Sequence, residues 1–135
     1  MKEYTTWHDF EKVIDKMVRH YKDTNENCSG VYGIPRGGLS IAVALSHRLN
    51  LPLFPDTGYG DIDKKILIVD DIADTGKTLE YYRDIHRPKV IYTMHYHKQS
   101  TVVPDFWVME KTDKWIVYPW ETSMLNYDWF NKQMM

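Results

Sequence analysis

The sequence contains one cysteine, no long hydrophobic run and almost no excess of charge of either sign. Cys28 has no second cysteine with which to form an internal disulfide, which fits a reducing compartment. No apolar stretch approaches the roughly 20 residues needed to cross a bilayer. The opening residues, MKEYTTWHDF, lack the apolar segment of a signal peptide. We therefore expect a cytoplasmic protein without a membrane partner.

The charge balance also argues against a nucleic-acid partner. The net charge is -2, and the 17 Lys and Arg residues are scattered along the chain. Such a chain has no basic stripe that would attract phosphate backbones. With 135 residues, 43% hydrophobic and 27% charged, its composition is that of an ordinary globular protein. We expect a single domain spanning residues 1–135.

Helical and strand-like segments alternate through the first two thirds of the chain. Apolar residues recur at helical spacing between residues 6 and 25, and Leu39, Val43, Leu45 and Leu49 mark a second helix. A third helix is expected from Gly76 to about His86. Strands are expected at 30–34, 65–69, 89–97, 106–109 and 115–118, and the LPLF stretch (51–54) is compatible with another. The alternation predicts an α/β fold with a central, mostly parallel sheet flanked by helices. The aromatic tail after Trp120 is expected to pack back on this body.

The most unusual stretch is KKILIVDDIADTGKTL, at residues 64–79. An apolar strand leads into two adjacent acids, Asp70 and Asp71, and then into a Thr-Gly-Lys-Thr turn. The segment from Asp74 to Thr78 supplies successive backbone N–H groups, two hydroxyls and a helix N-terminus, which together suit a phosphate monoester. The two acids could accept hydrogen bonds from sugar hydroxyls or hold magnesium through water. The expected ligand therefore carries hydroxyls or a metal at one end and a phosphate at the other.

Two other interpretations of this stretch explain less. A nucleoside-triphosphate P-loop needs a glycine five residues before Gly76, where this chain has Asp71. A simple helix cap would explain one Asp or Thr but not two carboxylates followed by the TGKT turn. The phosphate-site interpretation is retained.

A second glycine-rich turn, GIPRGG (33–38), follows the strand expected at 30–34. As a dinucleotide fingerprint it is weak, because Pro35 stands where the middle glycine belongs. As an anion loop, Gly37 and Gly38 allow the backbone to approach a ligand, and Arg36 supplies charge. Both glycine-rich turns follow strands, so they should open on the same edge of a parallel sheet.

The motif ILIVDDIADTGKTL resembles the ribose-5-phosphate-binding motif of type I phosphoribosyltransferases, and VYGIPRGGL resembles their pyrophosphate loop. The chain is most similar to the bacterial xanthine-guanine and hypoxanthine phosphoribosyltransferases. It shares with them a helix that carries Trp7, the Arg36–Leu39 loop, Lys98 after the fourth strand, and WIVYPWE at 115–121. The resemblance covers nearly the whole chain.

The resemblance implies transfer of a 5-phosphoribosyl group from phosphoribosyl pyrophosphate (PRPP) to a 6-oxopurine, with Mg2+ as cofactor and a homo-oligomer as the assembly. It implies that Asp74 accepts a proton at the purine N7, and that Asp70 and Asp71 contact ribose and magnesium. Lys98 would donate to the purine O6, Trp115 would stack on the ring, and Ile116 would complete the base site. The residues implied in PRPP binding are Arg36, Gly37, Gly38, Asp70, Asp71, Asp74, Thr75, Gly76, Lys77 and Thr78.

The chain departs from the family's pattern at one point. Family enzymes insert a long hairpin, the hood, before the acidic motif, and only TGYGDIDKK (57–65) occupies that place here. Lids exclude water and commit the substrate, so a shortened or missing hood leaves a second interpretation open. In that alternative, the chain is a non-catalytic PRPP-binding or nucleotide-binding regulatory module on the same fold.

Three further expectations concern single positions. The family's pyrophosphate loop holds a cis peptide, which would lie here between Pro35 and Arg36. His95 and His97 share one face of a strand, but without a third ligand nearby they are expected to be half-buried or rim histidines and not metal ligands. Trp115 has the alternative interpretation of an ordinary core tryptophan.

Overall fold

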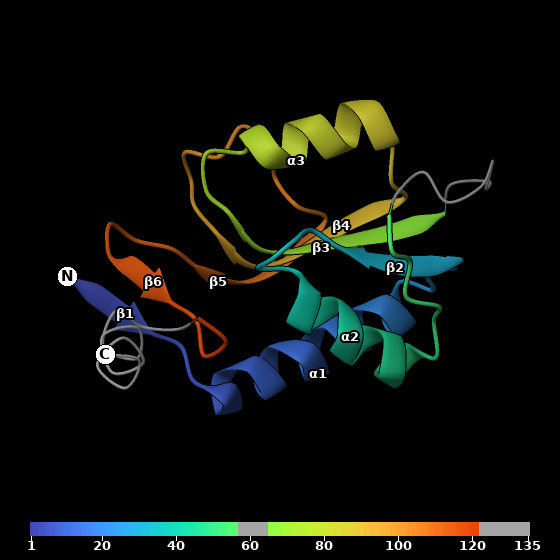
Figure 1. Cartoon of the computed structure of the whole chain (residues 1–135), viewed down its shortest axis with the longest axis horizontal. Coiled ribbons are helices and arrows are strands. Elements are labelled where there is room, and N and C mark those ends of the chain that lie inside the picture. The colour runs from blue at the N-terminus through green and yellow to red at the C-terminus, as the bar shows by residue number, and fades with distance from the viewer. Residues whose placement is uncertain (57–64, 122–135) are drawn as a thin grey trace, which may run out of the picture.

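A four-stranded sheet with helices on both faces forms the body of the protein, and a small two-stranded sheet lies beside it (Figure 1). The computed structural model describes residues 1–56 and 65–121. The elements are β1 (Lys2–Tyr4), α1 (Trp7–Asp23), β2 (Gly30–Gly33), α2 (Leu39–Leu49), β3 (Ile66–Ala73), α3 (Lys77–Tyr81) with a π-helical continuation (Tyr82–His86), β4 (Val90–Tyr96), β5 (Phe106–Glu110) and β6 (Trp115–Val117). The predicted α/β architecture is confirmed.

The main sheet has the strand order β2-β3-β4-β5, and every pairing in it is parallel. Helices α1 and α2 cover one face, and α3 covers the other (Figure 1). Because the strands are parallel, the loops after β2 and β3 emerge at the same edge of the sheet. This edge carries the site described below.

Helix α1 forms where the sequence predicts it, because its ends and its apolar face agree. Thr6 and Asp9 form a capping box, in which each side chain accepts a hydrogen bond from the other residue's backbone N–H. One face of the helix is buried against the sheet; its members are Phe10, Val13, Ile14, Met17, Val18 and Tyr21. Trp7, at the first turn, remains 53% exposed.

Helix α2 has the predicted bounds, but it buries a different face. Ile41, Ala42 and Leu45 are buried, whereas Leu39 and Val43 are 44% and 43% exposed. The helix is apolar on most of its circumference, so spacing does not identify the inward face. Close packing of Ala42 on Gly33 of β2 decides it, since a Cβ on Gly33 would collide with the Ala42 methyl group.

Strand β3 continues beyond Val69, where the sequence predicts that the strand ends. It runs to Ala73, so Asp70 and Asp71 lie within the strand and not after it. The reason is that β4 continues alongside, with Asp70 paired to Thr93 and Ala73 to Tyr96. The pairing with β2 ends at Val69. The two acids therefore lie beside the loop into which β2 turns away.

The remaining predictions have mixed outcomes. The LPLF stretch makes one isolated bridge, between Leu53 and Val31, and is not an extended strand, since two prolines, Pro52 and Pro55, lack donors. Strand β6 forms as expected, but it pairs with β1 in the second sheet. The shortened hood at 57–64 and the tail at 122–135 lie outside the described residues. Within the described part of the chain, no helix is long and apolar enough to cross a membrane.

Candidate active site

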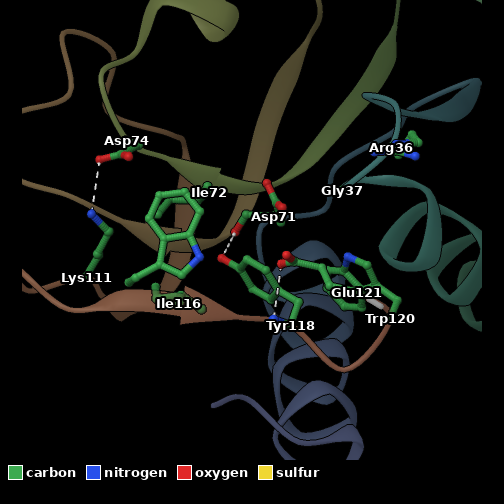
Figure 2. Close-up of a pocket in the computed structure, with 11 residues that line it drawn as sticks. Arg36, Gly37, Asp71, Ile72, Asp74, Lys111, Ile116, Tyr118, Trp120 and Glu121 are labelled. Carbon is green, nitrogen blue, oxygen red and sulfur yellow. Dashed lines mark hydrogen bonds and ion pairs between the residues drawn. The ribbon is translucent and has the colours of Figure 1, made fainter. Parts of the chain in front are cut away.

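A large cavity of about 510 Å³ opens where the loop after β2 meets β3, β6 and the segment after β5 (Figure 2). Arg36 and Gly37 lie at one end, Asp74 and Lys111 lie at the other, and Asp71 lies between them (Figure 2). The residues that line it are Arg36, Gly37, Asp71, Ile72, Asp74, Lys111, Trp115, Ile116, Tyr118, Trp120 and Glu121. The expectation that the two glycine-rich turns open on one edge is confirmed.

A small cavity of about 210 Å³ adjoins it under the TGKT turn. Its lining includes Asp74, Thr75, Gly76 and Thr78, and it shares Asp71, Ile72 and Asp74 with the large cavity. Gly76 has φ 92°, and a Cβ there would collide with Thr101, so only glycine fits this turn. The Lys77 side chain is not among those that line either cavity, and its backbone N–H bonds the Thr75 hydroxyl at 3.3 Å.

The loop after β2 reaches the large cavity through Arg36 and Gly37. The Pro35–Arg36 peptide is cis, as predicted. Gly37 lies against the Asp71 carboxylate so closely that a Cβ on it would overlap the Asp71 oxygens. Gly38 packs behind the loop, where a side chain would collide with the carbonyl of Val69. Thus the missing side chain at Gly37 leaves room for the Asp71 carboxylate, and the missing side chain at Gly38 lets the loop pack on β3.

Asp70 and Asp71 form an acidic pair at a position where a negative charge on either carboxyl is energetically unfavourable. Asp70 is 8% exposed, and its Oδ1 accepts a 2.8 Å hydrogen bond from the Asp71 backbone N–H. Burial raises the pKa of both carboxyls, and the charge of Asp71 raises the pKa of Asp70 further. Glu121, across the cavity, adds to the negative potential at Asp71. Among the described residues, no ion pair neutralises these three acids, so the site favours a cation.

Asp74 has the opposite environment. Its Oδ1 accepts hydrogen bonds from His97 Nδ1 at 2.9 Å and from Gln99 Nε2 at 3.0 Å, and Lys111 Nζ lies 3.6 Å away. Burial alone raises the pKa of Asp74, but the hydrogen bonds and the Lys111 charge outweigh it, so the pKa lies below its ordinary value. Asp74 is therefore ionised and acts only as a hydrogen-bond acceptor in the free protein. No interaction among the described residues reaches its second oxygen, Oδ2.

The cavity wall on the β6 side is aromatic and apolar. Trp115 is 64% exposed and lines the cavity, which excludes its alternative interpretation as a core residue. Tyr118 is buried and stacks on Trp120, with ring centroids 4.8 Å apart. Trp115 and Ile116 thus present an exposed ring and a buried apolar side chain to a ligand.

Tyr118 joins the wall to the sheet. Its hydroxyl donates to the Asp71 carbonyl oxygen at 3.2 Å and forms a second hydrogen bond, 2.8 Å long, with Nδ1 of His95 (Figure 2 draws the first bond). Burial lowers the pKa of His95 to about 4, so the ring is neutral at physiological pH. His95 is 1% exposed, so it lies deeper in the core than the half-buried or rim position expected of it. Among the described residues, no group of three or more potential metal ligands occurs.

Comparisons with known proteins identify the family of this chain. Residues 61–126 match the phosphoribosyl transferase domain family. A xanthine-guanine phosphoribosyltransferase from Idiomarina loihiensis is 26% identical, over 90% of this chain and 88% of the relative. Another from Desulfotalea psychrophila is 31% identical, over 70% of this chain and 71% of the relative. The crystal structure of a purine phosphoribosyltransferase from Pyrococcus horikoshii Ot3 has a TM-score of 0.78 and 32% identity, and the match covers 90% of this chain and 95% of that one.

The chain belongs to the phosphoribosyltransferase family. In this phosphoribosyltransferase, most of the expected site residues meet at the two cavities, but Gly38, Lys77 and Lys98 line neither. The Lys98 side chain is 82% exposed, and its Nζ lies 3.4 Å from Glu110. Lys111, with a side chain that is only 13% exposed, lines the cavity instead.

Sequence reasoning missed the residues that surround Asp74 in this phosphoribosyltransferase. His97 was expected to be half-buried or at the rim without a stated partner, and nothing was assigned to Gln99 or Lys111. The only signal for Lys111 was its place just after the strand at 106–110, since strand ends gather at the ligand-binding edge. That rule places Lys111 near the ligand-binding edge, but it does not identify Asp74 as its partner.

Proposed function

We propose that this phosphoribosyltransferase transfers the 5-phosphoribosyl group of PRPP to a 6-oxopurine and releases pyrophosphate. The observation that carries the proposal is that the two cavities share the Asp71–Asp74 segment. A sugar lying across this segment would keep its 5-phosphate in the small cavity and direct its C1 into the large one. Pyrophosphate and base would then occupy the large cavity together.

The PRPP contacts in this proposal follow from the two loops. Backbone N–H groups and hydroxyls of Asp74 to Thr78 hold the 5-phosphate, with Lys77 contributing its backbone at the start of α3. Arg36 and Gly37 hold the pyrophosphate, and Gly38 lets the loop lie close to β3. Asp70 and Asp71 accept hydrogen bonds from the ribose hydroxyls.

Magnesium fits the same acids. They present carboxylate oxygens, the ligands that Mg2+ prefers, and their raised pKa values show that a cation would relieve an unfavourable accumulation of charge. Mg2+ is commonly held by one or two carboxylates together with substrate phosphates, and Asp70 and Asp71 would supply the carboxylates. We assign Asp70 and Asp71 as its protein ligands, and its chemistry would be to neutralise charge on the leaving pyrophosphate.

The base lies between Trp115 and the Asp74 end of the cavity in this proposal. The bond between C1 and the pyrophosphate oxygen breaks as the bond between C1 and N9 forms, and N7 loses its proton to Asp74. Charge develops on the ribose as in an oxocarbenium ion, so positioning and the fixed carboxylates carry most of the catalysis. Asp74 is placed for this role, because its Oδ1 is held by two hydrogen bonds and by the ion pair with Lys111, while Oδ2 is left without a partner among the described residues.

A regulatory module without catalysis would need the PRPP contacts alone. The named relatives are transferases, and a module that binds only PRPP needs no base pocket of the kind that Trp115 and Ile116 line. We therefore favour the enzyme, acting in the cytoplasm on small-molecule substrates as a homo-oligomer of one-domain subunits.

The test is a transfer assay with PRPP, Mg2+ and guanine, xanthine or hypoxanthine, on the wild type and on Asp74→Asn. The amide has the shape of the carboxylate but cannot accept the proton, so kcat should fall by about 10²–10⁴-fold. PRPP binding, measured by calorimetry, should change much less. Asp113→Asn, an exposed acid in the loop after β5, is the matched control. An Asp74→Asn enzyme with wild-type kcat would remove the assignment, and a wild type inactive on all three bases would remove the function.

A further inference from the structure

We propose that Lys111, and not Lys98, is the residue that selects a 6-oxo group on the base. The inference rests on the proposed function and identifies the donor that the purine O6 meets. Lys111 follows β5 directly, and its backbone N–H donates to the Tyr96 carbonyl at 2.8 Å, so it is fixed at the end of the sheet.

The placement of the ammonium is specific. The Lys111 side chain is 13% exposed, lines the large cavity together with Trp115 and Ile116, and brings Nζ to 3.6 Å from Asp74 Oδ1. Figure 2 shows Lys111 and Asp74 facing each other across the end of the cavity that is remote from Arg36. A lysine with so little exposure and one carboxylate partner keeps donor capacity for a ligand, because an ammonium has three N–H groups.

Purine geometry connects the two residues. N7 and O6 are neighbours on one edge of a 6-oxopurine. If Asp74 meets N7, an ammonium beside the same carboxylate is in position to meet O6. An ammonium donates and cannot accept, so it stabilises a carbonyl oxygen and opposes the amino group that stands there in adenine. Lys111 and Asp74 together would recognise this edge of the base.

Lys98 does not have these properties. Its side chain is 82% exposed, its Nζ pairs with Glu110 at 3.4 Å, and it is not among the residues that line either cavity. The next residue back, His97, is the one that faces inward, where it bonds Asp74. The end of β4 therefore brings an imidazole to the carboxylate, and the end of β5 brings the ammonium.

A purely structural role for Lys111, holding Asp74 in place, makes a different prediction. It would slow transfer to every base by the same factor. A direct contact with O6 would slow transfer to 6-oxopurines selectively. Guanine and 2,6-diaminopurine separate the two roles, because they differ in the group at C6 and in the N1 proton that accompanies it.

The experiment measures kcat/KM for guanine and 2,6-diaminopurine with the wild type, Lys111→Met, Lys98→Met and, as a control, the exposed Lys114→Met. The wild type should prefer guanine by about ten- to hundredfold, the cost of facing a buried donor with another donor. Lys111→Met should reduce this ratio about tenfold or more, mainly through loss on guanine. Lys98→Met and Lys114→Met should keep the ratio.

Calorimetric binding of GMP and of the 2,6-diaminopurine ribonucleotide gives the same comparison without turnover. The selectivity of a variant with slow catalysis can therefore still be measured. An equal loss on both bases in Lys111→Met, or loss of selectivity in Lys98→Met, would overturn the inference and leave the proposed function in place. A wild type that transfers to neither base and binds neither nucleotide would overturn both. Thermal unfolding of each variant shows whether a loss reflects the fold.

Discussion

At Asp71, the stability of the free protein and the binding of a ligand make opposite demands on one buried carboxylate. Its carboxylate lies against the Gly37 backbone at the cavity, and its carbonyl oxygen accepts the Tyr118 hydrogen bond. The acid can lie this close to the loop only because position 37 has no side chain. Burial beside Asp70 makes the charge unfavourable in the free protein, while a ribose and a cation would make it favourable.

Replacing both acids should therefore separate binding from stability. In the variant Asp70→Asn with Asp71→Asn, PRPP binding in magnesium buffer should weaken about tenfold or more by calorimetry, because charge-assisted hydrogen bonds and metal ligands are lost. Unchanged PRPP affinity would contradict the assignment of these acids.

The stability of the same variant has a defined dependence on pH. A carboxyl with a raised folded pKa stabilises the fold while it is protonated, and this contribution is lost as the pH rises from about 4 through the raised value. Without Mg2+, the melting temperature of the wild type should thus fall more between pH 5.5 and pH 8 than that of the double variant. Thermal unfolding at the two pH values measures this, and equal losses would show that the acids are not buried as charges.

At the scale of elements, a hydrogen-bonded link joins β4, β3 and the segment after β6. His95 on β4 is 1% exposed and bonds Tyr118, which bonds the Asp71 carbonyl on β3. These segments are distant in the sequence, so the link fixes the aromatic wall of the cavity relative to the acids. It also makes the fold sensitive to acid.

The acid sensitivity can be predicted from the His95 pKa. Burial lowers it to about 4, whereas an unfolded histidine takes up its proton near pH 6.5. Between these values the unfolded state binds more protons, so the free energy of unfolding falls as the pH falls, by about 3 kcal/mol in total. Urea unfolding of the wild type and His95→Gln between pH 7 and pH 4.5 measures the difference in slope. His8→Gln, at an exposed position, is the control. A His95→Gln slope equal to that of the wild type would contradict the prediction.

At the scale of the whole molecule, the small β1–β6 sheet shares its core with the main sheet. One cluster of buried residues includes Phe10 of α1, Val31 of β2, Leu67 of β3 and Ile116 of β6. Trp7 and Trp120 extend it with ring contacts at 6.1 Å. The described residues of both sheets thus pack around one shared core. That residues 1–135 form a single domain stays a prediction.

One domain should unfold in one transition. Far-UV circular dichroism, which follows the helices, and tryptophan fluorescence, which follows the aromatic cluster near β6, should give the same urea midpoint. In the proposed homo-oligomer, this midpoint should rise with protein concentration. Separate midpoints for the two probes would show that the small sheet unfolds on its own, and independence from concentration would argue for a monomer.

The local chemistry of the site was predictable because it lies in short, continuous stretches. The turn from Asp74 to Thr78 and the glycines of the loop at 33–38 depend on neighbours in sequence, whereas the cis peptide before Arg36 was expected from the family resemblance. The parallel sheet follows from the alternation of helices and strands. These features predict where a phosphate and a pyrophosphate would lie.

Tertiary structure alone decided which side chains meet at Asp74. Lys98 is closer to Asp74 in sequence than Lys111, yet the pairing of β4 with β5 brings Lys111 beside the end of β4 and leaves Lys98 exposed. In the same way, the inward face of α2 was decided by the fit of Ala42 on Gly33. The physical reason is common to both cases. The sequence pattern identifies apolar residues and the ends of strands. The direction in which a side chain points depends on the residues that pack beside it in the folded protein.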